Sequence, residues 1–164
     1  MHNMSINGFM KQGYGQQYEE CVMNRLTIKL TQCTDVLQMD YVILGLEAAL
    51  GYHGLCHYDY YNYPVILSTD IPENLVIGNM PALYGVKKYP QAEATRYENV
   101  GVIPWHLAFF DTLAYNEYSE ELLQVLRNIE NDEEKMKLLY EEAARRNMLN
   151  ELKQQFEDLK DYMF

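Results

Sequence analysis

From Ser119 to the end, the chain carries a nearly continuous helical pattern, and this feature constrains the fold more than any other. Ser119 precedes two acidic residues and is typical of a helix N-cap. Apolar residues then recur every three or four positions, as in amphipathic helices. The two stripes are Leu122, Leu123, Leu126 and Ile129, then Met136, Leu139, Tyr140 and Ala143. Asn147 is expected to mark a kink or boundary. The pattern predicts a helical C-terminal third.

The last helical segment carries a seam that resembles a coiled coil. Its members repeat at spacings of four, three and four: Leu152, Phe156, Leu159 and Met163. Burying one Leu or Phe contributes ~1.5–3 kcal/mol, so the seam must be covered. One interpretation is an amphipathic helix packed on its own domain. The prediction to be tested is that the seam forms an interface with a second chain, either a copy of itself or a regulator.

The segment before Ser119 predicts helices first. Residues 1–16 are rich in Gly, Asn and Gln and are expected to form a flexible leader, followed by one domain over residues 17–164. A first helix is predicted by the shared face of Val22, Leu26, Leu30 and Cys33. A second is expected from Asp35 to Leu50, with Gly51 as its stop.

Strand signals follow in the middle of the chain. The aromatic and β-branched residues 58–67 predict one or two strands, with Pro64 at a break. Proline and glycine residues over 70–92 interrupt any longer helix, so only short helical turns are expected there. Val100 to Ile103 predict a short extended segment. The expected fold is therefore α+β, an α-β-α sandwich with a small antiparallel sheet flanked by helices.

Composition excludes several classes of protein. The net charge of -11 argues against unaided binding to nucleic acid or to an anionic membrane, which needs clustered Lys and Arg. No apolar run is long enough to span a bilayer, and the N-terminus lacks the apolar core of a signal peptide. Cys21, Cys33 and Cys56 are too few and too sparse for a disulfide framework. A cytoplasmic protein with buried thiols is expected.

The sequence lacks motifs that would indicate catalysis. It contains no G-x-S-x-G elbow, phosphate-binding loop or G-x-G-x-x-G motif, and its acidic pairs are expected on solvated helix faces. His53, Cys56 and His57 form an H-x-x-C-H cluster, but a structural zinc site needs four ligands and no second pair follows. We expect no enzyme, no cofactor and no metal site.

Aromatic residues are dense between residues 52 and 110, where catalytic polar groups are scarce. Tyr and Trp suit a small-molecule pocket, because the ring packs on an apolar ligand while the polar atom fixes it. The alternative is that these rings are core. Both interpretations remain open from the sequence.

Several stretches, in this order, resemble the autoinducer-binding domain of LuxR-type quorum-sensing regulators. They are LEAALGYHGL at 46–55, PVILSTDIPENL at 64–75, VIPW at 102–105 and YEEAARRNML at 140–149. The resemblance spans roughly residues 20–150. It implies an α-β-α sandwich that holds an acyl-homoserine lactone between sheet and helices. No helix-turn-helix segment follows, so we expect a module without its own DNA-binding domain.

The resemblance also implies ligand contacts. Trp105 matches an aromatic residue of the family's pocket, and Tyr84 is aligned with a pocket-side Tyr. Ile71 and Leu75 stand where the family has Tyr and Trp, and Tyr89 stands where it has the Asp that accepts the ligand amide. An unpaired polar group on a buried ligand costs ~1–3 kcal/mol. The expected ligand is therefore an acyl-homoserine-lactone-like or other apolar small molecule.

The predicted function is a non-catalytic sensing or regulatory module that binds an apolar signal, a regulator protein, or both. A homodimer, or a heterodimer with a full-length regulator, would be its working form. The alternative is a ligand-free interaction protein that uses its C-terminal amphipathic helix. A receptor predicts an enclosed apolar cavity near Trp105 and Tyr84, whereas an interaction protein predicts a filled core and an exposed apolar stripe.

Overall fold

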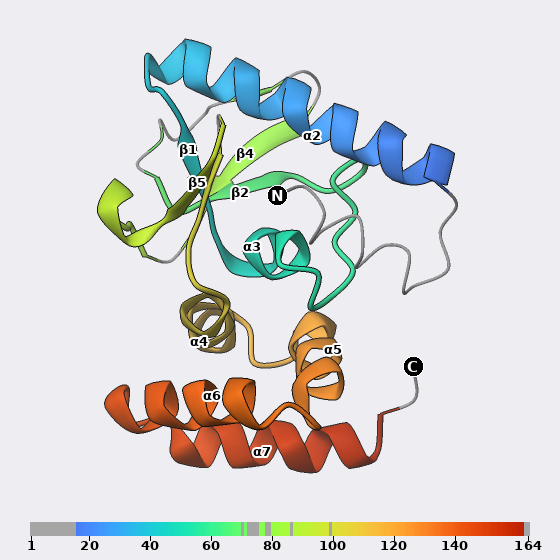
Figure 1. Ribbon diagram of the computed structural model, residues 1–164, viewed down its shortest axis with the longest axis vertical. Helices are drawn as coiled ribbons and strands as arrows, with labels where there is room; N and C mark the ends of the chain where they lie inside the picture. Colours follow the sequence, from blue (N-terminus) through green and yellow to red (C-terminus); the bar gives the residue numbers. More distant parts are fainter. Residues whose placement is uncertain are drawn as a thin grey trace.

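A mixed β-sheet lies between one long helix and a layer of shorter helices (Figure 1). The structure is a computed structural model and describes residues 16–69, 71, 76–77, 80–85, 87–98 and 100–162. The elements, in order, are α2 (Gln16–Leu37), β1 (Val42–Leu44), α3 (Leu46–Tyr52), β2 (Val65–Leu67), β3 (Val76–Ile77), β4 (Met80–Tyr84), the 3-10 turn η1 (Gln91–Glu93), β5 (Thr95–Tyr97), β6 (Val100–Val102), α4 (Trp105–Tyr115), α5 (Glu120–Ile129), α6 (Glu133–Arg145) and α7 (Leu149–Lys160).

The sheet has the strand order β3-β4-β2-β1-β6-β5. β1 pairs antiparallel with β2 and parallel with β6, while β2 pairs parallel with β4. The sheet is therefore mixed, where the sequence predicted an antiparallel one. All residues of β1, β2 and β6 are buried, as expected for strands covered on both faces. Helix α2 covers one face, and α3 and α4 lie on the other (Figure 1).

The predicted helix from Asp35 to Leu50 is wrong. Helix α2 ends at Leu37, β1 follows at Val42–Leu44, and α3 then runs from Leu46 to Tyr52. The apolar run that forms β1 is too short to show a helical or strand periodicity of hydrophobic residues. Pairing with two neighbouring strands decides its conformation. Gly45 lets β1 pass close to β2, because a Cβ there would meet the Ser68 hydroxyl oxygen at 2.0 Å.

The prediction of only short helical turns over residues 70–92 is also wrong in part, because β3 and β4 form there, beside η1. Of the strands predicted over residues 58–67, only β2 exists. The tyrosines before it lie in turns, where Tyr58 and Tyr60 donate hydrogen bonds to the carbonyls of Pro64 (2.5 Å) and Ala48 (2.8 Å). Buried tyrosine hydroxyls thus fix a loop rather than a strand.

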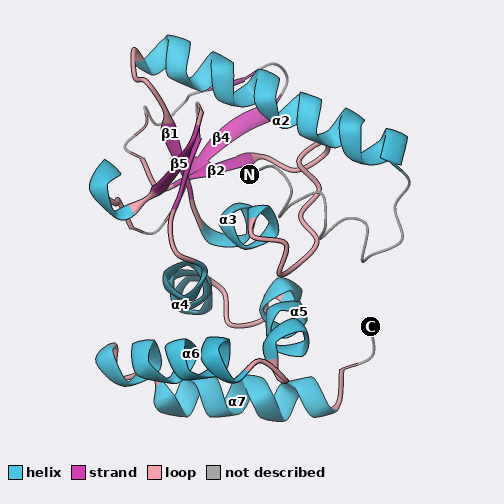
Figure 2. Cartoon of the chain, in the orientation of Figure 1, coloured by secondary structure: helices cyan, strands magenta, loops and turns pink. Residues whose placement is uncertain are grey.

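The helical C-terminal third is confirmed (Figure 2). Ser119 occupies the N-cap position of α5, and Asn147 has a positive φ of 58° at the break between α6 and α7. Helix α4 was not predicted. It packs on α3 and α6, and α5 packs on α7, so one apolar core extends from the sheet to the last helix. Among the described residues, no helix is both long enough and apolar enough to cross a membrane.

Candidate functional site

The structure describes the side chains of three residues expected to line an apolar pocket: Trp105, Ile71 and Tyr89. Trp105 begins α4, is 8% exposed, and meets the His106 ring edge-on at 5.7 Å between centroids. Ile71 is half-buried against the core. Tyr84 lies in β4, but its side chain, like the whole of Leu75, falls outside the described residues. Trp105 is therefore a core residue here.

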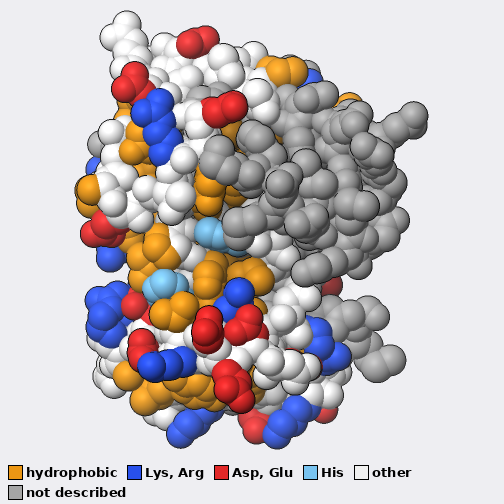
Figure 3. All heavy atoms as spheres, viewed as in Figure 1, with side chains coloured by type: hydrophobic (Ala, Val, Ile, Leu, Met, Phe, Trp, Pro, Cys, Tyr) orange, Lys and Arg blue, Asp and Glu red, His pale blue; other side chains and the backbone are white. Residues whose placement is uncertain are grey.

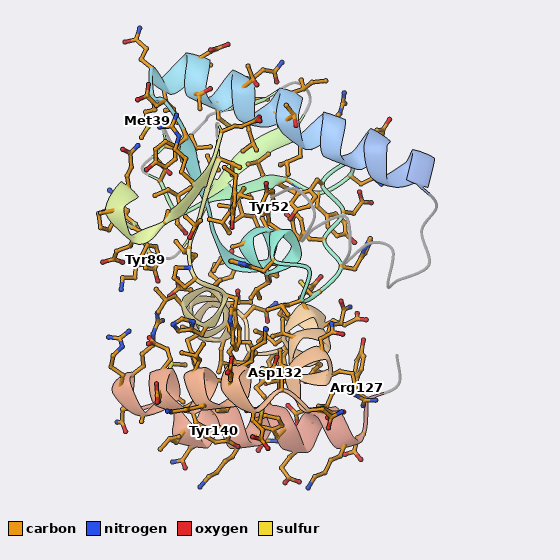
Figure 4. The ribbon with its side chains drawn as sticks, in the orientation of Figure 1. Met39, Tyr52, Tyr89, Arg127, Asp132 and Tyr140 are labelled. Carbon is orange, nitrogen blue, oxygen red and sulfur yellow. The ribbon has the colours of Figure 1, made fainter. Side chains whose placement is uncertain are left out.

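Tyr89 is buried, but its hydroxyl is already used within the chain. It donates to Asp111 Oδ2 at 2.6 Å. Arg146 Nη1 donates to Asp111 Oδ1 at 2.7 Å, and Arg146 Nε donates to Glu142 Oε2 at 2.5 Å. We call these four residues the Arg146 cluster. Figure 4 shows Tyr89 between the sheet and the helical layer. The cluster ties the segment after β4 to α4 and to the end of α6.

The charges of the Arg146 cluster stabilise one another. Burial acts to lower the pKa of Arg146, but the hydrogen bonds to Asp111, Glu142 and Tyr89 outweigh it and raise that pKa. Burial acts to raise the pKa of Glu142, but Arg145 and Arg146 outweigh it and lower that pKa. Burial and the hydrogen bond to Asp111 raise the pKa of Tyr89. The cluster therefore links elements of the fold and does not offer free polar groups to a ligand.

The sequence did not point to this cluster, and it placed Glu142 wrongly on a solvated face. Glu142 is 6% exposed and Asp111 is 3% exposed. A signal was present for Asp111, because it is the only charged residue in the apolar stretch WHLAFFDTLAY. A lone acid in a buried helix is expected to have a cationic partner, but which cation meets it depends on how α6 packs.

The His53 and Cys56 side chains serve different contacts, and His57 donates its backbone N–H to Gln124 Oε1 at 2.9 Å. His53 Nε2 lies 2.7 Å from the carbonyl oxygen of Ile103, and burial lowers the pKa of His53. The buried Cys56 thiol approaches the Glu47 carbonyl at 4.0 Å, and burial raises its pKa. Among the residues that the structure describes, no group of three or more His, Cys, Asp or Glu side chains is arranged to hold a metal ion.

The seam predicted to meet a second chain is mostly core. Leu152 is fully buried and Leu159 is 5% exposed, both within the chain's own core. For these two residues the expected interface is corrected: α7 packs this face on α5 and α6, which supply the missing cover. Phe156 remains half-buried. Met163 lies outside the described residues.

An apolar strip does remain exposed where α6 meets α7. Tyr140 stacks on Phe156 at 6.2 Å between centroids, with ring planes 4° apart. Tyr140 is 40% exposed, and Leu149, two turns before Phe156 on α7, is 39% exposed. We call these three residues the Tyr140 strip. Figure 3 shows hydrophobic side chains gathered over the α6–α7 pair among charges of both signs, and Figure 4 shows Tyr140 there.

A polar cavity of about 410 Å³ opens on the other flank of α7. Leu113, Glu117 and Tyr118, at and after the end of α4, line one side. The other side comes from α7 and consists of Asn150, Glu151, Gln154, Gln155 and Asp158. Gln155 is the residue that the sequence could have revealed, because it is a polar residue inside the apolar seam. None of the residues expected to bind a ligand lines this cavity.

Comparisons with known proteins identify no relative. No family model matches the chain, no curated protein matches it, and no solved structure matches it. The function must therefore be argued from the geometry of the chain itself.

Proposed function

We propose that this chain is a non-catalytic interaction module that binds a protein partner through the Tyr140 strip, and that the partner is a second copy of the chain. The observation that carries the proposal is Tyr140, which stays 40% exposed while it stacks on the half-buried Phe156 of a well-packed helix pair. Exposed aromatic rings with few degrees of freedom are typical anchors of protein interfaces. This is the ligand-free alternative that the sequence left open.

The charges beside the strip favour a second copy. Glu141 on α6 and Lys160 on α7 are exposed but already form ion pairs within the chain, with Lys137 and Glu157 respectively, so both helices carry charges of both signs. In a two-fold dimer the same patch meets itself, so α7 of one copy can lie across α6 of the other. That arrangement brings charges of both signs on each helix towards charges of both signs on the partner. Such a mixed patch can pair with a second copy of itself.

The interior argues for this function over a small-molecule receptor. Trp105 is packed in the core, and the Tyr89 hydroxyl already donates to Asp111, so Tyr89 offers no free donor to a ligand. The cavity at α7 has three acidic residues among its lining, which do not favour an uncharged apolar signal. The net charge of -11 likewise does not suit direct contact with DNA.

The test is the oligomeric state of the purified chain, measured by sedimentation velocity from about 1 to 100 µM in 0.15 M salt, where charges more than ~8 Å apart are screened. We expect concentration-dependent dimers. Changing Tyr140→Glu together with Leu149→Glu should leave a folded monomer and weaken dimerisation at least tenfold, because it places like charges in both copies' strips.

Leu138→Glu is the matched control. Leu138 is also 40% exposed on α6 but lies on the opposite flank of that helix, away from α7. It should leave dimerisation unchanged. A wild-type chain that stays monomeric at 100 µM would refute the second copy as partner. So would a Leu138→Glu variant that loses as much affinity as the double variant.

A further inference from the structure

The cavity between the end of α4 and helix α7 has acidic and amide side chains among its lining residues, beside the apolar Leu113 and the ring of Tyr118. Three carboxylates line it: Glu117, Glu151 and Asp158. No Lys or Arg lies among its lining residues. Asp158 already accepts one hydrogen bond from Gln154 Nε2 at 2.9 Å, but a carboxylate has further acceptor positions. The site is therefore suited to a group that is both positively charged and rich in N–H donors.

Gln155 supplies a second, independent indication of a ligand. Its side chain forms part of the cavity wall and is 2% exposed. Its Nε2 donates to the carbonyl oxygen of Glu117 at 2.8 Å, which fixes the orientation of the amide. Its Oε1 has no hydrogen-bond partner among the described residues. Buried acceptors in native proteins are nearly always paired, so a missing donor is expected at this point.

Tyr118 adds a planar surface at the edge of the same cavity. It is 85% exposed and lies on the segment that connects α4 with α5. A guanidinium group can stack on an aromatic ring while its N–H groups reach several acceptors in one plane, whereas an ammonium group is a compact point charge. The spread of acceptors across the cavity, beside an exposed ring, favours the guanidinium.

We infer that this cavity is a binding site for a guanidinium group, held by the carboxylates of Glu117 and Glu151, the Gln155 amide oxygen and the Tyr118 ring. The site does not depend on the proposed dimer. It occupies the flank of α7 that carries Asn150, Gln154 and Asp158, whereas Phe156 and Leu149 of the Tyr140 strip lie on the flank towards α6. Its volume, about 410 Å³, is that of a small-molecule site.

The experiment titrates the full chain with arginine amide and follows the Gln155 side-chain NH₂ signals by NMR in 0.15 M salt. Citrulline amide, which replaces the guanidinium by a neutral urea of the same shape, is the matched ligand control. Lysine amide has the same charge as arginine amide but an ammonium group. We expect arginine amide to shift the Gln155 signals with saturation, and both controls to bind at least tenfold more weakly.

Two variants connect binding to the cavity. Glu151→Gln removes a lining carboxylate and should raise the Kd for arginine amide about tenfold, which is the effect of losing one charge-assisted hydrogen bond. Glu157→Gln changes an exposed glutamate of α7 that does not line the cavity, and it should leave the Kd unchanged. Urea unfolding of both variants checks that they fold as the wild type does.

Several results would overturn the assignment. One is the absence of any saturable shift of the Gln155 signals up to about 50 mM arginine amide. Equal affinity for citrulline amide would show that the guanidinium charge plays no part, and equal affinity for lysine amide would show that the guanidinium is not recognised. An equal effect of Glu157→Gln would show that only the overall negative charge attracts the probe.

Discussion

Removing Arg146 is the sharpest test of how the sheet and the helical layer are held together. The substitution Arg146→Met keeps most of the side-chain volume but deletes the charge. Asp111, whose side chain is 4% exposed, then loses its only ion-pair partner among the described residues and keeps only the Tyr89 hydroxyl. Glu142 still has Arg145. The damage is therefore concentrated at Asp111.

The magnitude follows from burial. Breaking a buried ion pair by deleting one partner leaves an uncompensated buried charge and typically costs about 3–5 kcal/mol. We expect a loss of that size in the free energy of unfolding. Adding Asp111→Asn removes the buried charge but keeps an acceptor for Tyr89. The double variant should therefore be more stable than Arg146→Met alone, with a coupling energy of about 1–3 kcal/mol.

The assay is equilibrium unfolding in urea, followed by far-UV circular dichroism and by fluorescence of the single tryptophan, Trp105. Because Trp105 is 8% exposed, its native emission should be blue-shifted and weakly quenched by acrylamide. Arg145→Met is the control, because Arg145 also contacts Glu142 but its side chain is 61% exposed, and it should have little effect. A loss below about 1 kcal/mol for Arg146→Met, or a double variant no more stable than it, would refute the reasoning.

Three further predictions concern protonation, thiols and DNA. Burial lowers the pKa of His53 and of His106 below the usual 6.5, so the unfolded chain binds more protons and stability should fall as the pH drops below 6.5; unfolding midpoints that stay constant from pH 7 to pH 5 would contradict this. Burial raises the pKa of Cys33 to about 12 and that of Cys56 well above its usual value. In a Cys21→Ser variant, both thiols should resist a thiol reagent until urea unfolds the chain, and rapid labelling of the native protein would count against their burial. With a net charge of -11, the chain alone should not shift duplex DNA in a gel, and salt-sensitive submicromolar binding would be the contrary result.

The sequence could predict the elements whose signals are local. Helices α5, α6 and α7 were visible because their apolar residues recur at helical spacing, and the break at Asn147 lies where it was expected. Ser119 occupies the N-cap position of α5, but its hydroxyl donates to Glu47 and Glu121 and makes no cap hydrogen bond to the helix backbone. The short apolar strands β2 and β6 were also found. The resemblance to LuxR-type domains stays a proposal, because no relative was found that tests it.

The sequence could not predict which neighbour each surface would meet. Leu152 and Leu159 signal only that they need burial, and the packing of α7 on α5 and α6 decided that their own domain covers them. In the same way, β1 became a strand because β2 and β6 lie on either side of it, although its short apolar run also suits a helix.

The candidate sites were decided by tertiary structure for the same physical reason. Asp111 and Arg146 are 35 residues apart, and their pairing depends on how α6 packs on α4. Gln155 faces Glu117 only because α7 returns past the end of α4. Periodicity and capping act over a few neighbouring residues, so the sequence by itself determined the helical third and its apolar faces. Ion pairs and cavities join residues that are distant in the chain, and only the packed fold determined which of them meet.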